Sequence, residues 1–135
     1  MKQLILIAIG CLLGASASYG QCVIYADDNT GAFGAGYNND NKPTTYKECT
    51  DLAIKECKSK GGNNCTFFYK SAKTGWWGVI SGKKQDGRNY FQGGDGYSSQ
   101  SEAERAVRKK YRDDGGADAD NVKVVTWYTY SNVKL

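Results

Sequence analysis

The sequence predicts an α+β fold in which six strands form a largely antiparallel sheet and two helices pack on one face of it. Two observations favour this class. The chain contains two segments with the apolar spacing of amphipathic helices, and short runs of β-branched and aromatic residues flank each segment. These segments and their flanks also match each other at a shift of 54 residues, from Thr45 to Ser99, which indicates a tandem repeat of a strand–strand–helix–strand unit.

The first twenty residues have the pattern of a secretory signal peptide. Lys2 supplies a positive charge, an apolar run covers residues 4–13, and small residues follow. The run is shorter than the roughly 20 residues that cross a membrane. We therefore expect residues 1–20 to be removed and residues 21–135 to form one secreted or periplasmic domain without a transmembrane segment. A lipid anchor on Cys11, which follows a glycine, remains an open alternative.

The first repeat, about residues 22–70, is predicted to contain two strands, a helix and a third strand. The strands are expected at residues 22–26, 32–37 and 65–70, and the helix at residues 45–58. The first two strands are joined by Asp-Asp-Asn-Thr-Gly, and Asp, Asn and Gly are the residues that turn geometry favours.

The second repeat, about residues 76–130, follows the same order. Its strands are expected at residues 76–81, 88–92 and 122–130, and its helix at residues 99–113. The first two strands are joined by a segment that again contains Gly and Asp, as turns favour.

Both predicted helices begin with a capping box, in which a Ser or Thr side chain bonds to the backbone of a Glu three residues later. The boxes are Thr45 with Glu48 and Ser99 with Glu102. Apolar residues then recur on one face of each helix: Cys49, Leu52, Ala53 and Cys57 on the first, and Ala103, Ala106, Val107 and Tyr111 on the second. Paired glycines follow at 61–62 and 115–116, where a left-handed residue commonly ends a helix.

Four of the five cysteines lie after residue 20, and an even number in an exported chain favours disulfide bonds. In a helix, Cys49 and Cys57 are separated by about 12 Å along the axis. A disulfide needs Cα atoms within roughly 7 Å, so these two residues cannot pair. We predict the bonds Cys57–Cys65, across a short turn, and Cys22–Cys49, between the first strand and the start of the helix.

Several stretches resemble a known family. The segments "IYADDNTGAFGAGYN", "KECTDLAIKEC" and "NCTFFY", with the counterparts "GVISG", "SEAERAVRKKY" and "KVVTWY", make nearly all of the mature chain similar to the secreted bacterial family called domain of unknown function 4189. The resemblance implies export and a shared duplicated fold, and it implies no activity. The family carries the helix-end cysteine pair in both halves, whereas Tyr111 and Asn121 take these positions in the second half here.

Strand alternation defines a candidate binding face. If Cys22 bonds to the helix, the residues beside it in the strand point to the opposite face of the sheet. When the same alternation is applied to the second repeat, Trp76 is expected to point toward the helices and Trp77 away from them. The predicted partner-binding residues on this outer face are Trp77, Tyr25, Phe68, Val79 and Val23. A loop folded over the face is the alternative interpretation.

The composition argues against several function classes. The sequence has no histidine, which excludes the usual Ser-His and Cys-His nucleophilic sites, and we expect no enzyme activity, metal or cofactor. The acidic loop with Asp118 and Asp120 lacks the spacing of an EF-hand. Of the 18 basic residues, Lys2 lies in the predicted signal peptide, which leaves 17 against 14 acidic residues. This net charge of +3 is evenly spread, so a nucleic-acid partner is not expected.

These observations lead to a functional hypothesis. We expect a non-enzymatic module that binds another envelope or secreted protein, plausible as an inhibitor or immunity-type factor, because aromatic side chains are frequent interface anchors. The alternative is a glycan or cell-wall binding module in which Trp77 and Tyr25 stack on sugar rings.

Overall fold

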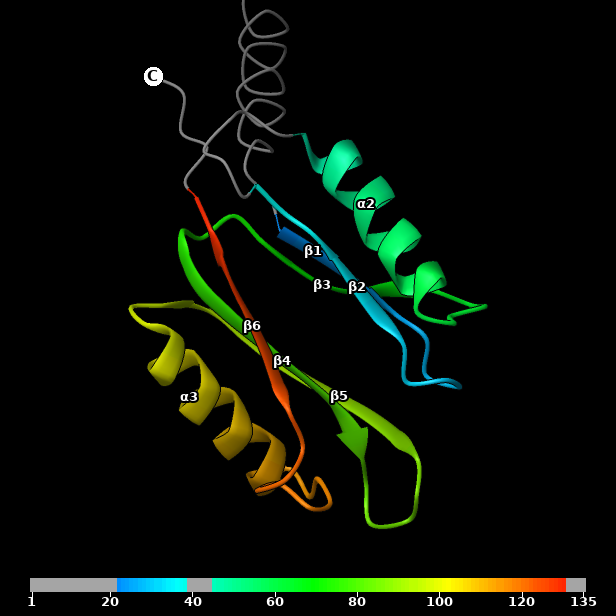
Figure 1. Cartoon of the computed structure of the whole chain (residues 1–135), viewed down its shortest axis with the longest axis vertical. Coiled ribbons are helices and arrows are strands. Elements are labelled where there is room, and N and C mark those ends of the chain that lie inside the picture. Colours follow the sequence, from blue (N-terminus) through cyan, green and yellow to red (C-terminus); the bar gives the residue numbers. More distant parts are fainter. Residues whose placement is uncertain (1–21, 39–44, 131–135) are drawn as a thin grey trace, which may run out of the picture.

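A computed structural model describes residues 22–38 and 45–130 (Figure 1). Within these ranges the α+β class is confirmed, with six strands and two helices. The elements are β1 Cys22–Ala26, β2 Phe33–Gly36, α2 Tyr46–Ser59, β3 Thr66–Ser71, β4 Gly75–Lys83, β5 Asn89–Tyr97, α3 Gln100–Asp113 and β6 Val124–Thr129. The predicted signal peptide and Cys11 lie outside the described residues.

The six strands form two separate antiparallel sheets where the sequence predicted one. Their orders are β2-β1-β3 and β5-β4-β6, so in each sheet the first strand of the unit lies in the centre. In both halves the helix connects the second strand to the third. The halves therefore share one topology, while the tandem duplication of the sequence stays a prediction.

The two sheets face each other, and the helices lie outside them (Figure 1). The cluster between the sheets takes Cys22, Ile24 and Ala26 from β1 and Trp77 and Val79 from β4. Separate clusters join α2 to β1 and α3 to β4 and β6. The order of layers is thus helix, sheet, sheet, helix, which differs from the prediction of two helices on one face of a single sheet.

Local signals in the sequence predicted the helices well. Thr45 Oγ1 accepts a hydrogen bond from Glu48 N and Ser99 Oγ from Glu102 N, each at 3.1 Å. The buried residues of α2 are Cys49, Ala53 and Cys57, and those of α3 are Ala103, Val107 and Tyr111, so the buried positions of the two helices correspond at a distance of 54 residues. Leu52 was also predicted to lie on the buried face, but it is 51% exposed.

The two helices sit differently on their sheets. A Cβ atom added to Gly34 would lie 2.2 Å from Ala53 O, and one added to Gly36 would lie 1.8 Å from Cys49 O. The backbone of α2 therefore lies directly over β2, the edge strand, and its other main contacts are with β1. In contrast, α3 contacts all three strands of its sheet. The helix-side face of β3 is consequently left without a helix over it.

Asp27 ties the end of β1 to the turn before β3. Its buried carboxylate accepts hydrogen bonds from the backbone N–H groups of Asn29 (2.9 Å), Asn63 (2.8 Å) and Asn64 (3.1 Å). These bonds favour the charged carboxylate, those of Asn64 and Asn63 most strongly, and they lower the pKa of Asp27 from 3.8 to about 2.

We predict that Asp27→Asn lowers the free energy of unfolding at pH 7. The folded-state pKa lies below the unfolded value, so the carboxylate stabilises the fold above about pH 4, and this contribution is lost as the pH falls through about 2. The difference between variant and wild type should therefore shrink between pH 4 and pH 2 in urea unfolding followed by circular dichroism. Asp28→Asn, on an exposed neighbour, is the control. A difference that is the same at every pH would contradict the assignment.

Candidate functional site

Three of the five predicted surface residues lie in the interior. Trp77, Val79 and Val23 are fully buried. Trp77 and Val79 do point away from α3, as the parity predicted, but the face they occupy is covered by the other sheet. The predicted outer face is therefore an internal interface, and neither an open surface nor a face covered by a loop.

The prediction of which β1 side chains face the helix was wrong by one residue. Val23 and Tyr25 pack with α2, whereas Cys22 and Ile24 belong to the cluster between the sheets. In β4 it is Gly78 that lies under α3, near Val107. The faces of the two strands thus align at a shift of 55 residues, from Val23 to Gly78, although the helices align at 54.

The same error affects one predicted disulfide. Cys57 and Cys65 are bonded, with Cα atoms 6.2 Å apart, as predicted. The Cys22–Cys49 bond is not formed, because Cys22 points toward the second sheet and Cys49 packs against Val23 on the opposite face. Both residues keep buried thiols. Burial raises the pKa of Cys22 well above its usual value and that of Cys49 to about 11.

One surface of the first sheet keeps exposed aromatic groups. We call it the β3 surface, and it consists of Tyr25, Tyr46, Phe67 and Lys70, on the side of the sheet that α2 covers only over β1 and β2. The ring of Phe67 is 50% exposed and meets Tyr25 edge to face, with centroids 6.1 Å apart. The Lys70 ammonium lies 4.8 Å from the centre of the Tyr46 ring.

A bulge in β3 turns two consecutive aromatic side chains toward the second sheet. Tyr25 pairs with Phe67 and Ile24 with Tyr69, so Phe68 has no partner position in β1. Phe68, a predicted surface residue, is half-buried against Phe91. Tyr69 donates a hydrogen bond to Asp95 Oδ1 (3.0 Å), and burial together with this carboxylate raises the pKa of Tyr69 to about 12.

The backbone of β3 has a strand partner on one side only. β3 is the last strand of its sheet and pairs with β1. No strand among residues 22–38 and 45–130 pairs with its outer edge. The β3 surface therefore combines a strand edge that has no strand partner in these ranges with an exposed aromatic ring. Neither Phe67 nor the bulge was singled out by the sequence pattern.

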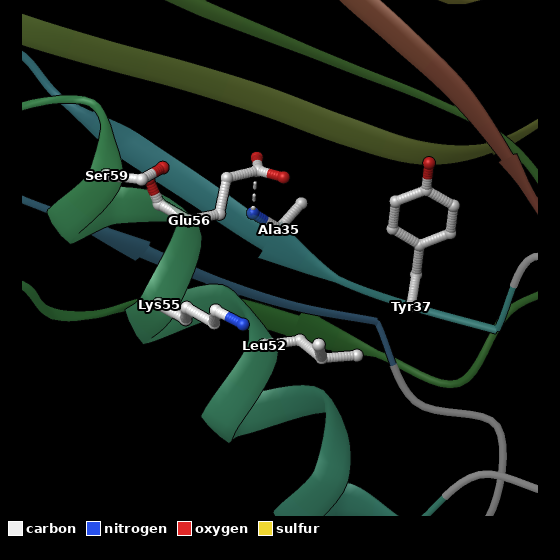
Figure 2. Close-up of a pocket in the computed structure, with 6 residues that line it drawn as sticks. All are labelled: Ala35, Tyr37, Leu52, Lys55, Glu56 and Ser59. Carbon is white, nitrogen blue, oxygen red and sulfur yellow. Dashed lines mark hydrogen bonds between the residues drawn. The ribbon is translucent and has the colours of Figure 1, made fainter.

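A groove lies at the opposite edge of this sheet, between α2 and β2 (Figure 2). Its volume is about 420 Å³. It is lined by Ala35, Tyr37, Leu52, Lys55, Glu56 and Ser59. Glu56 Oε1 accepts a hydrogen bond from Ala35 N (3.2 Å), and the Tyr37 ring stacks on Trp127 with centroids 5.6 Å apart.

A second concave region lies where the turns of the two sheets meet, and it is polar. It is lined by Asp28, Asn29, Lys84, Gly87, Arg88, Asn89 and Tyr90. Both of its cations already have partners: Arg88 Nε contacts Asp86 Oδ2 at 2.7 Å, and Lys84 lies over the Tyr90 ring and donates to the backbone carbonyl of Asp114. Asn89 Nδ2 also bonds to Asp28 O (2.8 Å). This last hydrogen bond joins the two halves at this end.

The described residues contain no group of three or more His, Cys, Asp or Glu side chains placed to hold a metal ion. In the acidic loop, Asp118 accepts a hydrogen bond from Asn121, and Asp120 pairs with Arg112 at 2.8 Å. In the same ranges, no helix has both the length and the apolar character needed to span a membrane.

Comparison with models of protein families, with curated proteins and with solved structures found no match. The resemblance to domain of unknown function 4189 thus stays a prediction.

We predict that the thiols of Cys22 and Cys49 react with iodoacetamide only after denaturation, because both are buried and their pKa values are raised. Peptide mapping without reduction should yield Cys57 linked to Cys65. These two residues are the internal control, since they should react only after reduction. A peptide that links Cys22 to Cys49 would contradict the arrangement of β1.

Proposed function

We propose that this chain is a non-enzymatic protein-binding module of the secreted or periplasmic space, of the inhibitor or immunity type, and that it binds its partner through the β3 surface. The observation that carries the proposal is the position of Phe67. Its ring is exposed on an edge strand whose outer backbone groups have no strand partner in the described part of the chain.

Edge strands in soluble proteins are usually protected. Short strands, Lys or Pro residues, bulges or a covering element keep other chains from pairing with them. β3 has six residues, a bulge and one lysine, yet Phe67, one of the four large apolar side chains exposed in the described residues, belongs to it and is 50% exposed. Aromatic residues are enriched among the side chains that contribute most to protein–protein affinity. A protein partner therefore explains this exposure.

Two features support the proposed secreted or periplasmic location. The Cys57–Cys65 bond is of the kind that persists in oxidising compartments, and residues 1–20 have the pattern of a signal peptide. The family resemblance noted in the sequence adds support for export.

The geometry of the aromatic rings favours a protein over a glycan. A sugar stacks on a flat aromatic face, whereas Tyr25 and Phe67 meet at 81° and so do not form one flat platform. Edge-to-face packing is one of the arrangements that neighbouring aromatic rings prefer in protein cores and interfaces.

The test is an affinity capture from envelope and secreted fractions with the oxidised mature protein, its Phe67→Ser variant and a Tyr130→Ser control. Tyr130 is exposed but lies outside the β3 surface. We expect one protein to be retained by wild type and by the control. Its affinity should fall about tenfold or more in Phe67→Ser, the effect of losing roughly 1.4 kcal/mol. Circular dichroism checks that each variant is folded.

Two results would count against the proposal. Retention of the same protein by all three forms would show that Phe67 makes no contact with it. Sedimentation of the wild type with insoluble cell wall, lost in Phe67→Ser, would favour the glycan alternative.

A further inference from the structure

The helix α2 projects past β2, which is the edge strand that it covers. Because its backbone lies over Gly34 and Gly36, one flank of the helix projects past the edge of β2. The flank carries Leu52, Glu56 and Ser59, which together with Ala35 and Tyr37 line the groove (Figure 2). Adjacent strands lie about 4.8 Å apart, so the space under this flank corresponds to the position of one more strand.

The edge of β2 has the hydrogen-bonding groups that such a strand would need. Ala35 stands opposite Ile24 in the pairing of β2 with β1, yet its N–H points outward to Glu56 Oε1 at 3.2 Å. The Glu56 carboxylate thus occupies the place of a carbonyl group on a neighbouring strand. The same oxygen also contacts Lys60 Nζ at 3.3 Å.

The groove offers both apolar and charged contacts to an added chain. Leu52 is half exposed, although it was predicted on the buried face of α2. The Tyr37 ring is held in place by its stacking on Trp127. Glu56 is half-buried and reaches the strand, whereas Lys55 is exposed at the rim. A carboxylate at the strand edge favours a basic side chain on the chain that pairs there, which would compete with Lys60 for Glu56.

We propose that this groove binds an extended segment of a partner protein, which adds to β2 as a fourth strand beneath α2. Its backbone carbonyl replaces Glu56 at the Ala35 N–H, its basic side chain pairs with the released Glu56 carboxylate, and an apolar side chain packs on Leu52. The β3 surface lies at the other edge of the same sheet, so this site is independent of the proposed function.

A second copy of the chain does not fit this position. Symmetric pairing of β2 with β2 of another copy would bring the two strands to about 4.8 Å. Because α2 lies directly over β2, the two helix axes would be about 5 Å apart, whereas packed helices need about 8–10 Å. A single extended segment without a covering helix avoids this clash.

The experiment uses synthetic octapeptides and the ¹⁵N-labelled mature protein. The first peptide alternates Thr and Val and carries one central Arg. The second replaces Arg by norleucine, and the third is N-methylated at alternate residues, which removes strand hydrogen bonds. We expect saturable chemical-shift changes at residues 33–37 and 52–59 with a Kd of about 1 mM or below. The norleucine peptide should bind roughly two- to fivefold more weakly, as for an exposed ion pair, and the N-methylated peptide should not bind.

The Glu56→Gln variant separates the role of the charge from that of the fold. Glutamine keeps an acceptor for the Ala35 N–H but removes the charge, so the Arg and norleucine peptides should bind this variant equally. Glu104→Gln, an exposed position of α3 that pairs with Arg108, should leave the preference for Arg unchanged. Phe67→Ser should bind the peptides like wild type, which distinguishes failure here from failure of the β3 proposal.

Three outcomes would overturn the inference. These are no shift changes at residues 33–37 with any peptide, binding that is insensitive to N-methylation, and shift changes at the same residues on dilution of the protein alone, which would identify a second copy as the occupant.

Discussion

The stacked pair of Trp77 and Trp127, which are neighbours in the second sheet on the face that meets the first sheet, is the contact on which the rest of this structure depends. The rings are 5.8 Å apart and nearly parallel, at 14°. The Trp77 indole N–H donates to Thr129 Oγ1 (3.1 Å), and this hydroxyl lies 3.1 Å from Lys73 O, so a large side chain is buried without leaving its polar atom unsatisfied. Tyr69 packs against the Trp77 ring and Tyr37 against the Trp127 ring, with centroids 5.5 and 5.6 Å apart, so the inner face of each sheet is covered by the other half. Since each sheet also has a helix outside, its strands are apolar on both faces, as Val23 and Ile24 illustrate.

Burial of both faces leaves the sheet edges as the places where the first sheet can meet another molecule. Gly34 and Gly36 let α2 approach β2 more closely than any side chain would allow, and the helix is therefore displaced from the centre of its sheet. The displacement has two consequences. It exposes Phe67 on the helix side of β3, and it creates the groove beside β2 that Glu56 closes. In the second half α3 contacts all three strands.

The features that the sequence predicted correctly are those set by neighbouring residues. The caps at Thr45 and Ser99, the buried faces of both helices and the Cys57–Cys65 bond each depend on positions fewer than ten residues apart. The face of β1 could not be predicted in this way, because the run Cys-Val-Ile-Tyr-Ala is apolar on both sides and alternation then has no polar side to define. The assumed Cys22–Cys49 bond led to the prediction that Cys22 and Ile24 face the helix, whereas they face the second sheet. Three further features depend on long-range packing, and no local pattern in the sequence indicated them. They are the covering of Trp77 by the other sheet, the bulge at Phe68 and the exposure of Phe67.

The most direct test of this account compares the free energies of unfolding of Trp77→Ala and Trp76→Ala. Trp77 is fully buried between the sheets, while its neighbour Trp76 is half-buried on the other face and packs edge to face with Tyr128. We predict that Trp77→Ala lowers the free energy of unfolding by about 3–5 kcal/mol, as for large-to-small changes in a core, and that Trp76→Ala has a clearly smaller effect. Equal losses for the two variants, or a larger loss for Trp76→Ala, would contradict the packing of the two sheets through Trp77.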